Sequence, residues 1–336
     1  MTDQNQSSLR VEGLHRRFKT SIKAAVDHAN LEIAPGEIHA LTGESGSGKS
    51  TLLRIIAGFE RSSAGSIVLN GKTLFDIHSG VSIPAEKRNI GLVFQDHALF
   101  PHLTVAENIA YGLKKKMRTE RVTRMLDLVH LAPYANHYPH RISGGQAQRV
   151  ALARALAPQP ELLLMDEPFN SLDRRLKRSL LPEIRRIIKA ANVPALVVSH
   201  DRDEVYSLAE RISIIREGSI LQSGKPEELY ERPRSCYVAE FFGEANFLKD
   251  GDRTLMIRPE YIGISAKSER EYRGRIIDEQ YRGDRHEYRI EISQGRFSGQ
   301  FLTVRDYVKR NTMKTGQACS MSFAGDQLIE ISEDGG

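Results

Sequence analysis

Apolar and polar positions follow two different periods along the first two thirds of the chain. Residues 9–42 contain short runs with the two-residue period of β-strands, and the last run, EIHALTG, leads directly into a glycine-rich segment. The residues that follow, TLLRIIAGF at 51–59, place leucine and isoleucine at helical spacing, and Gly58 is positioned to end that helix. The pattern therefore predicts a strand, a glycine loop and a helix in direct succession.

Later apolar runs predict the rest of a sheet. Residues 66–75 are typical of a hairpin that turns at Asn70-Gly71. Continuous apolar runs predict buried strands at 90–95, 161–166, 195–200 and 211–218. Helical patterns lie between the last three runs, and a more polar helical section occupies about 97–157. This order predicts an α/β fold with a mixed or parallel sheet and a helical subdomain.

The pattern changes beyond Gly243. Two segments, EELYERP and CYVAEFFG, predict a helix pair that closes the first domain. After them, short alternating strands are separated by glycine turns, which is typical of a small antiparallel all-β barrel. We therefore predict a first domain at residues 1–243 and a smaller barrel-like domain at 244–336.

Composition and charge exclude several classes of protein. The net charge is +5, but the longest basic run is Lys114–Lys116, which is too short for a polybasic block and disfavours nucleic acid as a partner. A run of 18 apolar residues, as a membrane span requires, does not occur, and the N-terminal residues have no signal-peptide pattern, so a cytosolic protein is expected. Cys236 and Cys319 have no metal-ligand spacing.

The glycine-rich segment matches a phosphate-binding loop. Gly43-x-x-x-x-Gly48-Lys49-Ser50 has the spacing at which backbone N–H groups converge on a phosphate at a helix N-terminus. Lys49 is expected to reach the β- and γ-phosphate oxygens, and Ser50 to bind Mg²⁺. The alternative is a chance glycine turn, which the strand before and the helix after disfavour. The predicted phosphate loop comprises Gly43, Glu44, Ser45, Gly46, Ser47, Gly48, Lys49, Ser50 and Thr51.

Residues at the ends of the predicted strands supply candidate catalytic and metal-binding groups. Asp166 is the candidate carboxylate ligand of Mg²⁺, and Glu167 is the candidate general base for the attacking water. His200 ends the next run, and Gln95 ends an earlier one, where its amide can coordinate Mg²⁺ or water. Parallel strands bring these ends to one sheet edge. The alternatives are a solvated strand end, a packed or surface histidine and an ordinary loop glutamine.

A second anion site is predicted in the segment RISGGQAQRVALARALA. Ser143, Gly144 and Gly145 are expected to cap an amphipathic helix, followed by Gln146, so that the helix offers a hydroxyl and free N–H groups to an anion. The helical section before it is expected to hold this SGGQ segment away from the phosphate loop. The expected anion is therefore the γ-phosphate bound by another copy of the chain. The alternative is an N-cap without a ligand.

Together these motifs resemble the ATP-binding subunit of an ATP-binding-cassette (ABC) transporter. GESGSGKST, the Gln95 loop, ISGGQ, LLLMDEP, NSLD and VVSHD follow one another in that family's order over nearly all of residues 9–243. The resemblance implies a P-loop ABC ATPase fold and a head-to-tail homodimer. Two ATP molecules with Mg²⁺ would lie between the phosphate loop of one copy and the SGGQ segment of the other.

The same resemblance assigns roles outside the main motifs. Ser171, Leu172 and Asp173 match the loop that couples the two ATP sites, and Phe18 is the best match for the aromatic residue that stacks on adenine. Ile142 stands where the family usually has leucine, and the stretch after Phe18 is longer than the family's pattern. The C-terminal module, with LMIRPE at 255–260, resembles the OB-like or TOBE-like regulatory barrel of import-type subunits.

The family's role implies partners and a location. An import-type ATPase is a peripheral protein at the cytoplasmic face of the inner membrane, where it powers separate integral membrane permease subunits and is served indirectly by a periplasmic or extracellular substrate-binding protein. Phe100, Pro101 and Leu103 are expected to meet the permease, unless they are core residues. The cargo predicted from likeness is ferric iron, with polyamine, phosphonate, sulfate and sugar importers as alternatives. A DNA- or ribosome-associated ABC ATPase is the rival class, and a nucleotide-dependent regulator is disfavoured by Glu167 and His200.

Overall fold

The structure is a computed structural model that describes residues 8–19, 21–94, 98–170, 172–266, 271–307 and 313–333. The chain forms two compact units, Met1–Pro226 and Glu227–Gly336, each with its own hydrophobic core. Contacts assign residues 227–243 to the second unit, whereas the sequence pattern placed them at the end of the first domain. The division of function at residue 243 stays a prediction.

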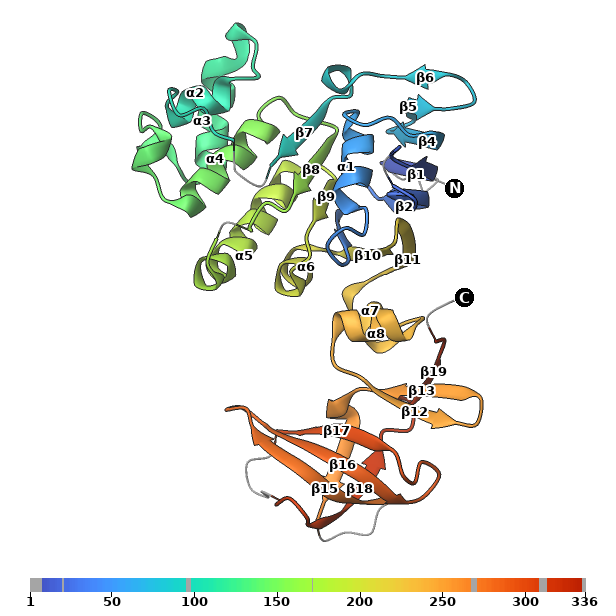
Figure 1. Cartoon of the computed structure of the whole chain (residues 1–336). Helices are drawn as coiled ribbons and strands as arrows, with labels where there is room; N and C mark the ends of the chain where they lie inside the picture. The colour runs from blue at the N-terminus through green and yellow to red at the C-terminus, as the bar shows by residue number, and fades with distance from the viewer. Residues whose placement is uncertain are drawn as a thin grey trace, which may run out of the picture. The chain divides into compact units, whose positions relative to one another are not determined.

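The first unit is built on a six-stranded sheet with the order β11-β10-β3-β9-β8-β7 (Figure 1). Its parallel strands are β3 (Ile38–Thr42), β7 (Ile90–Val93), β8 (Leu162–Asp166), β9 (Ala195–Val198) and β10 (Arg211–Arg216), and β11 (Ser219–Gly224) runs antiparallel to β10. These strands are nearly continuous apolar runs because both faces of the sheet are covered. Their parallel order brings the carboxyl ends of β3, β8 and β9 to one edge.

A second, antiparallel sheet has the order β2-β1-β4-β5-β6. Its strands are β1 (Leu9–Arg16), β2 (Val26–Ile33), β4 (Ala64–Leu69), β5 (Lys72–Asp76) and β6 (Val81–Ser82). Asn70 and Gly71, both at positive φ, make the β4–β5 turn, as the sequence predicted. Helix α1 (Lys49–Ala57) packs between the two sheets, because its Leu52, Ile55 and Ile56 share one core with apolar side chains of both.

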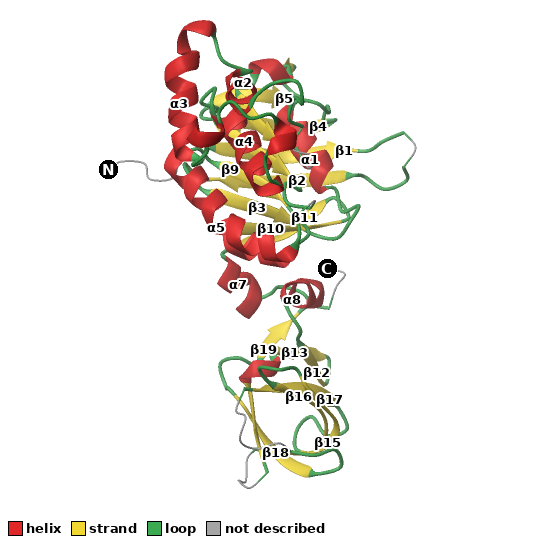
Figure 2. Ribbon diagram, turned by 90° about the vertical axis from the view of Figure 1, so that its left-hand side faces the viewer, coloured by secondary structure: helices red, strands yellow, loops and turns green. Residues whose placement is uncertain are grey.

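Helices cover the other face of the six-stranded sheet (Figure 2). They are α2 (Val105–Ala110), α3 (Arg118–Leu128), α4 (Gly144–Leu156), α5 (Arg174–Ala191) and α6 (Arg202–Leu208), with 3₁₀ turns at Ala85–Lys87, Lys115–Met117, Ala132–Tyr134 and Pro139–Arg141. Met125, Leu126 and Val129 are buried on one face of the α3 region. The predicted helical subdomain is therefore present, with α2, α3 and α4 packed together.

The second unit is mainly antiparallel β-structure. It contains α7 (Pro226–Glu231), α8 (Cys236–Phe242), a sheet of β12 (Asn246–Asp250), β13 (Arg253–Ile257) and β19 (Ile329–Ile331), and a 3₁₀ turn at Pro259–Tyr261. A second sheet has the order β14 (Ile262–Ser265), β18 (Ala318–Phe323), β15 (Tyr272–Tyr281), β16 (His286–Gln294) and β17 (Phe301–Asp306). The buried Arg258 donates hydrogen bonds to the carbonyls of Tyr230, Ala239 and Glu244, which joins the two helices to the β-structure.

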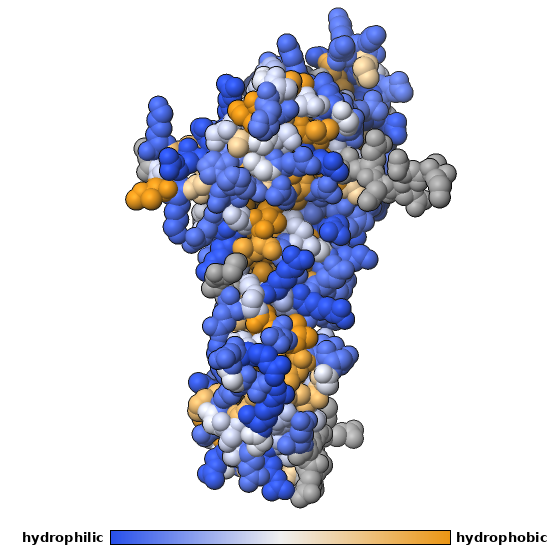
Figure 3. Space-filling view, turned by 90° about the vertical axis from the view of Figure 1, so that its right-hand side faces the viewer, coloured by the Kyte–Doolittle hydropathy of each residue, from blue (hydrophilic) through white to orange (hydrophobic). Residues whose placement is uncertain are grey.

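Hydrophobic side chains are scattered over the surface. On the face drawn in Figure 3, they form small groups among hydrophilic ones. Exposed large apolar side chains include Phe59 and Tyr111 in the first unit and Tyr281 and Tyr307 in the second. Among the described residues, none of the helices is both long and apolar enough to cross a membrane.

Candidate functional site

The phosphate loop connects β3 to α1 and requires glycine at two positions. A Cβ atom on Gly43 (φ 151°) would lie 2.1 Å from the carbonyl oxygen of Ile215, and one on Gly48 (φ 107°) would lie 2.1 Å from that of Ala25. Both distances are too short for any side chain. Gly46 (φ 79°), by contrast, faces open space. The loop is therefore held at its two ends, and its middle is open to a ligand.

A cavity of about 210 Å³ lies against this loop. The described residues that line it are Ala25, Ser45, Gly46, Gly48, Lys49, Ser50, Thr51 and Glu167. Glu167 follows the end of β8, so the parallel sheet brings it to the phosphate loop from a distant part of the sequence. The structure thus brings together two groups of residues that the sequence predicted separately.

Lys49 is the buried cation of this cavity. Its side chain turns back onto the loop, where Nζ donates hydrogen bonds to the carbonyl oxygens of Gly43 at 2.9 Å and Glu44 at 2.7 Å. Burial lowers the pKa of Lys49, and the nearby Glu167 and Asp166 partly oppose this. A nearby anion stabilises an ammonium group that is desolvated and bonded to neutral carbonyls. Lys49 is therefore suited to bind a phosphate oxygen.

Ser50 and Asp166 meet across the gap between α1 and β8. The Ser50 hydroxyl donates a hydrogen bond of 2.9 Å to Asp166 Oδ1. Burial raises the pKa of Asp166, and the hydrogen bond from Ser50 opposes that effect. A hydroxyl and a carboxylate are hard oxygen ligands, and a divalent cation favours the ionised form of the buried carboxyl, so this pair fits Mg²⁺.

Glu167 occupies a strained position at the end of β8. Its φ of 46° lies in the left-handed region, which is costly for a long side chain. Its backbone N–H donates to the Val198 carbonyl at 3.0 Å, which fixes the residue against β9. Its Oε1 lies 3.3 Å from His200 Nδ1, and its Oε2 accepts a hydrogen bond from Asn170. The carboxylate is therefore held by neighbours on both sides while it faces the cavity.

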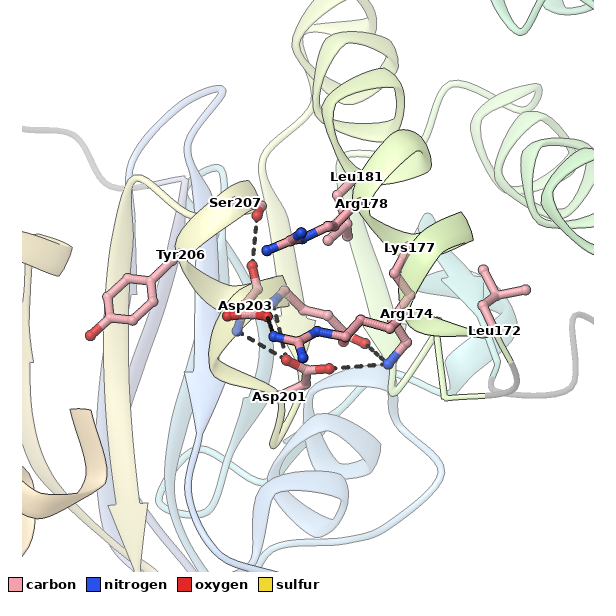
Figure 4. Close-up of a pocket in the computed structure, with 10 residues that line it drawn as sticks. Leu172, Arg174, Lys177, Arg178, Leu181, Asp201, Asp203, Tyr206 and Ser207 are labelled. Carbon is pink, nitrogen blue, oxygen red and sulfur yellow. Dashed lines mark hydrogen bonds and ion pairs between the residues drawn. The ribbon is translucent and has the colours of Figure 1, made fainter. Parts of the chain in front are cut away.

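An ion cluster anchors α6 directly after His200 (Figure 4). Lys177 on α5 lies 2.6 Å from Glu204 Oε1 and donates a hydrogen bond of 3.1 Å to Asp201. The Ser199 hydroxyl donates to the other oxygen of Glu204 at 2.6 Å, and Asp201 caps α6. Because Ser199 and Asp201 flank His200, this cluster fixes the backbone on both sides of the histidine.

The SGGQ segment begins α4 with a capping box. The Ser143 hydroxyl accepts a hydrogen bond from the Gln146 N–H at 3.3 Å, and the Gln146 side chain accepts one from the Ser143 N–H at 2.8 Å. The predicted N-cap is therefore present. Ser143 and Gly144 are exposed, whereas the cavity beside the phosphate loop is lined by a different set of described residues. One chain thus presents the two anion-binding motifs as separate surfaces.

The segment before α5 packs against this cap. Asp173 is the N-cap of α5, where its Oδ1 accepts hydrogen bonds of 3.0 Å from the N–H groups of Arg175 and Leu176. A Cβ atom on Gly144 would lie 3.3 Å from the Leu172 side chain, so a larger residue there would crowd the cap. Asp173 therefore acts on its own helix in this chain. Ser171 and Gln95, two further residues of the prediction, lie outside the described residues.

Phe18 follows β1 in the connection to β2. Its ring is half-buried, and the guanidinium carbon of Arg16 lies 4.8 Å from the ring centroid. The same connection ends at Ala25, which lines the cavity. Phe18 thus belongs to the segment that borders the phosphate loop, and its contact with adenine stays a prediction.

A groove beside the helical subdomain contains one of the predicted permease contacts. Phe100 is half-buried, its ring lies 4.2 Å from that of Tyr111, and Arg154 lies over it at 5.3 Å. Pro101 is exposed and Leu103 half-buried. Of these three residues, Phe100 lines the groove, and its partial burial fits neither a pure core role nor a fully solvated one.

Comparison with known proteins finds two families along the chain. The family described as "ABC transporter" matches residues 26–170, and the "TOBE domain" family matches residues 255–329. The putrescine transport ATP-binding protein PotG of Escherichia coli K12 is 48% identical over 227 residues, which cover 66% of this chain and 59% of PotG. The chain thus spans about three fifths of that relative.

Other relatives align over more of their length. The Fe(3+) ions import ATP-binding protein FbpC of Rhizobium etli is 38% identical over 304 residues, covering 81% of this chain and 84% of that protein. FbpC of Yersinia pestis is 42% identical over 272 residues, which cover 74% of this chain and 77% of that protein. This chain belongs to the ATP-binding proteins of the ABC transporter family. A solved structure, cbiO1 of Clostridium perfringens, part of the transporter complex cbiONQ, aligns with a TM-score of 0.60 at 27% identity, covering 67% of this chain and 91% of cbiO1.

Family membership confirms the predicted fold class and the general activity. The chain has the P-loop ABC ATPase fold with a helical subdomain and a C-terminal all-β TOBE domain, and it is an ATP-binding ATPase coupled to transport. The roles of individual residues stay predictions.

Sequence reasoning missed several residues that shape the site of this ABC ATPase. It assigned no role to Asn170, which holds Glu167, or to Lys177 and Glu204, which anchor α6. It also missed Ala25, whose carbonyl requires glycine at position 48. Only Asn170 carried a sequence signal, because it lies three residues after Glu167, within reach of a turn.

Proposed function

We propose that the cavity beside the phosphate loop binds ATP with Mg²⁺ and hydrolyses it. The observation that carries this proposal is the convergence of Lys49 and Ser50 with Asp166 and Glu167, from two distant parts of the chain, at one cavity. Lys49 exchanges its loop carbonyls for β- and γ-phosphate oxygens, while backbone N–H groups of the loop bind the β-phosphate.

The metal position would be formed by Ser50 and Asp166. Bound Mg²⁺ there would neutralise phosphate charge as the bond to the γ-phosphate breaks. Glu167 accepts the proton of the attacking water, since its carboxylate faces the cavity and is held by Asn170 and His200. His200 positions Glu167 and contacts the γ-phosphate. Gln95 supplies an additional ligand to Mg²⁺ or water.

We propose that a homodimer completes the site. The exposed capping box at Ser143 offers an anion-binding helix end that is separate from the phosphate loop of its own chain. Ser143, Gly144, Gly145 and Gln146 of one copy would therefore bind the γ-phosphate held by another, with Asp173 at the dimer interface. Phe18 stacks on the adenine. ATP between two such surfaces favours the closed dimer, and hydrolysis reopens it.

The partners and cellular location follow from the transporter family. The ATPase would bind integral membrane permease subunits at the groove around Phe100 and would lie at the cytoplasmic face of the inner membrane as a peripheral protein. A periplasmic or extracellular substrate-binding protein would deliver the cargo to the permease. No role for nucleic acid is proposed.

The proposed cargo is ferric iron. Support comes from relatives named as Fe(3+) import proteins, which align over 77% and 84% of their length. The alternative cargo is a polyamine. It is supported by the 48% identity to a putrescine transport protein, although that alignment is shorter. Disruption of the gene should abolish uptake of labelled ferric iron and spare that of labelled putrescine. The opposite result would remove the iron assignment and leave the ATPase proposal intact.

The catalytic proposal is tested with Glu167→Gln. This variant should bind ATP with the parental affinity, because the cavity keeps its shape, but should lose nearly all hydrolysis of ATP. Glu86→Gln, which changes an exposed glutamate outside the cavity lining, is the matched control and should hydrolyse at the parental rate. Parental hydrolysis by Glu167→Gln would contradict the assignment of the general base.

A further inference from the structure

An irregularity in the β1–β2 ladder brings three polar side chains together. Leu14 pairs with Ala29 and Arg16 pairs with Val26, so His15 alone faces both Asp27 and His28. Two residues opposite one define a β-bulge, a feature that redirects side chains and is frequent beside functional sites. His28 has a φ of 46°, in the left-handed region, which few residues other than glycine adopt and in which histidine is one of the more frequent. The bulge therefore places two histidines and an aspartate in one small volume.

The geometry of the three side chains suits a metal ion. The Nδ1 atoms of His15 and His28 lie 3.0 Å and 2.8 Å from the same Oδ1 of Asp27. One ligand atom from each residue lies within 4.8 Å of the other two. Ligand atoms around a tetrahedral zinc ion are about 3.3 Å apart, given metal–ligand distances near 2.0 Å. The two measured N–O distances, 3.0 Å and 2.8 Å, are close to this spacing, so small side-chain shifts are enough to admit such an ion.

We propose that His15, Asp27 and His28 bind a divalent transition-metal ion of the Zn²⁺ or Co²⁺ class. A ligand set of two imidazoles and one carboxylate binds such transition-metal ions in preference to the hard ions Mg²⁺ and Ca²⁺. His15 is 28% exposed and His28 73% exposed in their side chains, so an ion can enter from solvent and keep a water molecule as a further ligand.

This site is connected by backbone hydrogen bonds to the phosphate loop. The Asp27 N–H donates to the carbonyl of Gly218 at 2.9 Å, and the Gly218 N–H donates to the carbonyl of Ser47 at 2.9 Å. The connection between the two strands also carries Ala25, which lines the nucleotide cavity. A bound metal ion should therefore restrain one wall of the ATP site. This consequence rests on the proposed function, whereas metal binding itself does not.

The binding site is tested on the full chain, without a histidine tag and without nucleotide, by titration with Co²⁺ and detection of its visible absorption. We expect binding of one equivalent of Co²⁺ that Zn²⁺ displaces. Asp27→Asn and His28→Asn should each weaken Co²⁺ binding at least tenfold, and asparagine at position 28 tolerates the left-handed backbone. The control is His78→Gln, an exposed histidine two residues from Asp76.

Two results would overturn the proposal. One is the same Co²⁺ affinity and spectrum in the parent, Asp27→Asn and His28→Asn, with unchanged thermal unfolding of the variants. The other is no Co²⁺ binding to the parent, which would leave the three side chains as a hydrogen-bonded cluster. The link to the nucleotide is tested separately: saturating Zn²⁺ should change the ATP affinity of the parent at least threefold and leave that of Asp27→Asn unchanged. An unchanged parental affinity, with Co²⁺ bound, would remove the link and retain the site.

Discussion

Removal of the Lys177 ammonium group should destabilise the first unit through a buried carboxylate. In Lys177→Met, the stem of the side chain is retained and the charge is lost. The Lys177 side chain is 15% exposed and that of Glu204 is 0% exposed, so the Glu204 carboxylate is left in a dry environment, where the Ser199 hydroxyl is its remaining partner among the described residues. Asp201, which is 31% exposed in its side chain, is solvated and is affected less.

The burial of Glu204 sets the expected loss in the free energy of unfolding. Breaking a buried ion pair by removal of one partner costs about 3–5 kcal/mol, and the retained hydroxyl bond places this case at the lower end, near 3 kcal/mol. For a unit of this size, such a loss lowers Tm by about 6–12 °C. The exposed pair of Lys23 and Glu217, with side chains 73% and 63% exposed, gives the matched control: Lys23→Met should cost less than about 1 kcal/mol.

The pH dependence has a defined sign. Burial lowers the pKa of Lys177, but hydrogen bonds to Glu204 and Asp201 outweigh that effect and raise it. A raised lysine pKa gives stabilisation that is complete below the unfolded value, about 10.4, and is lost as the pH rises through the folded value. Burial raises the pKa of Asp201, but the hydrogen bond and charge of Lys177 outweigh burial and lower it. The stabilisation from Asp201 is therefore complete above its unfolded pKa of about 3.9 and is lost as the pH falls through the folded pKa. The full difference in the free energy of unfolding between the parent and Lys177→Met is therefore expected from about pH 5 to 9.

The assay is urea unfolding of the full chain, followed by circular dichroism. The double variant Lys177→Met/Glu204→Gln should recover at least half of the loss, because it removes the uncompensated charge. A free energy of unfolding for Lys177→Met equal to that of Lys23→Met would refute the reasoning. So would the absence of any recovery in the double variant.

Three further results are expected. Lys49→Ala should weaken ATP binding at least tenfold in a fluorescent-nucleotide titration, because it removes the buried ammonium group of the cavity; an unchanged affinity would contradict the phosphate-loop assignment. Gly48→Ala should abolish ATP binding, because its Cβ would meet the Ala25 carbonyl at 2.1 Å, while Gly80→Ala, also at positive φ but in open space, should bind normally; equal binding by both would show that the contact is unimportant. Burial raises the pKa of Cys319 to about 11, so its thiol should react with a disulfide reagent at pH 8 far more slowly in the folded chain than in urea, and equal rates would contradict its burial.

Local patterns predicted the main elements of the fold and much of the candidate site. The continuous apolar runs of β8 and β9 identified buried parallel strands, and the strand order then implied that residues after both strands would meet at one edge. Glycine spacing identified the phosphate loop, and the serine before two glycines identified the cap of α4. These features depend on residues close together in the sequence, so a pattern reveals them.

Features that depend on long-range contacts could not be predicted. The left-handed backbone of Glu167 results from its hydrogen bond to Val198, and the need for glycine at position 48 results from the approach of Ala25. The assignment of α7 and α8 to the second unit rests on contacts between distant residues, among them the hydrogen bonds from Arg258 to carbonyls of both helices. The β-bulge at Asp27 is likewise visible only in the ladder register, since neither strand alone carries its signal.

The central claim is that the SGGQ segment of one copy completes the ATP site of another. Light scattering of purified Glu167→Gln, with and without ATP and Mg²⁺, tests it most directly. We predict a monomer without nucleotide and a dimer with ATP, and we predict that addition of Ser143→Arg abolishes the dimer while ATP still binds to the monomer. A Glu167→Gln protein that binds ATP and stays monomeric, or a dimer that persists in the Ser143→Arg variant, would contradict the account.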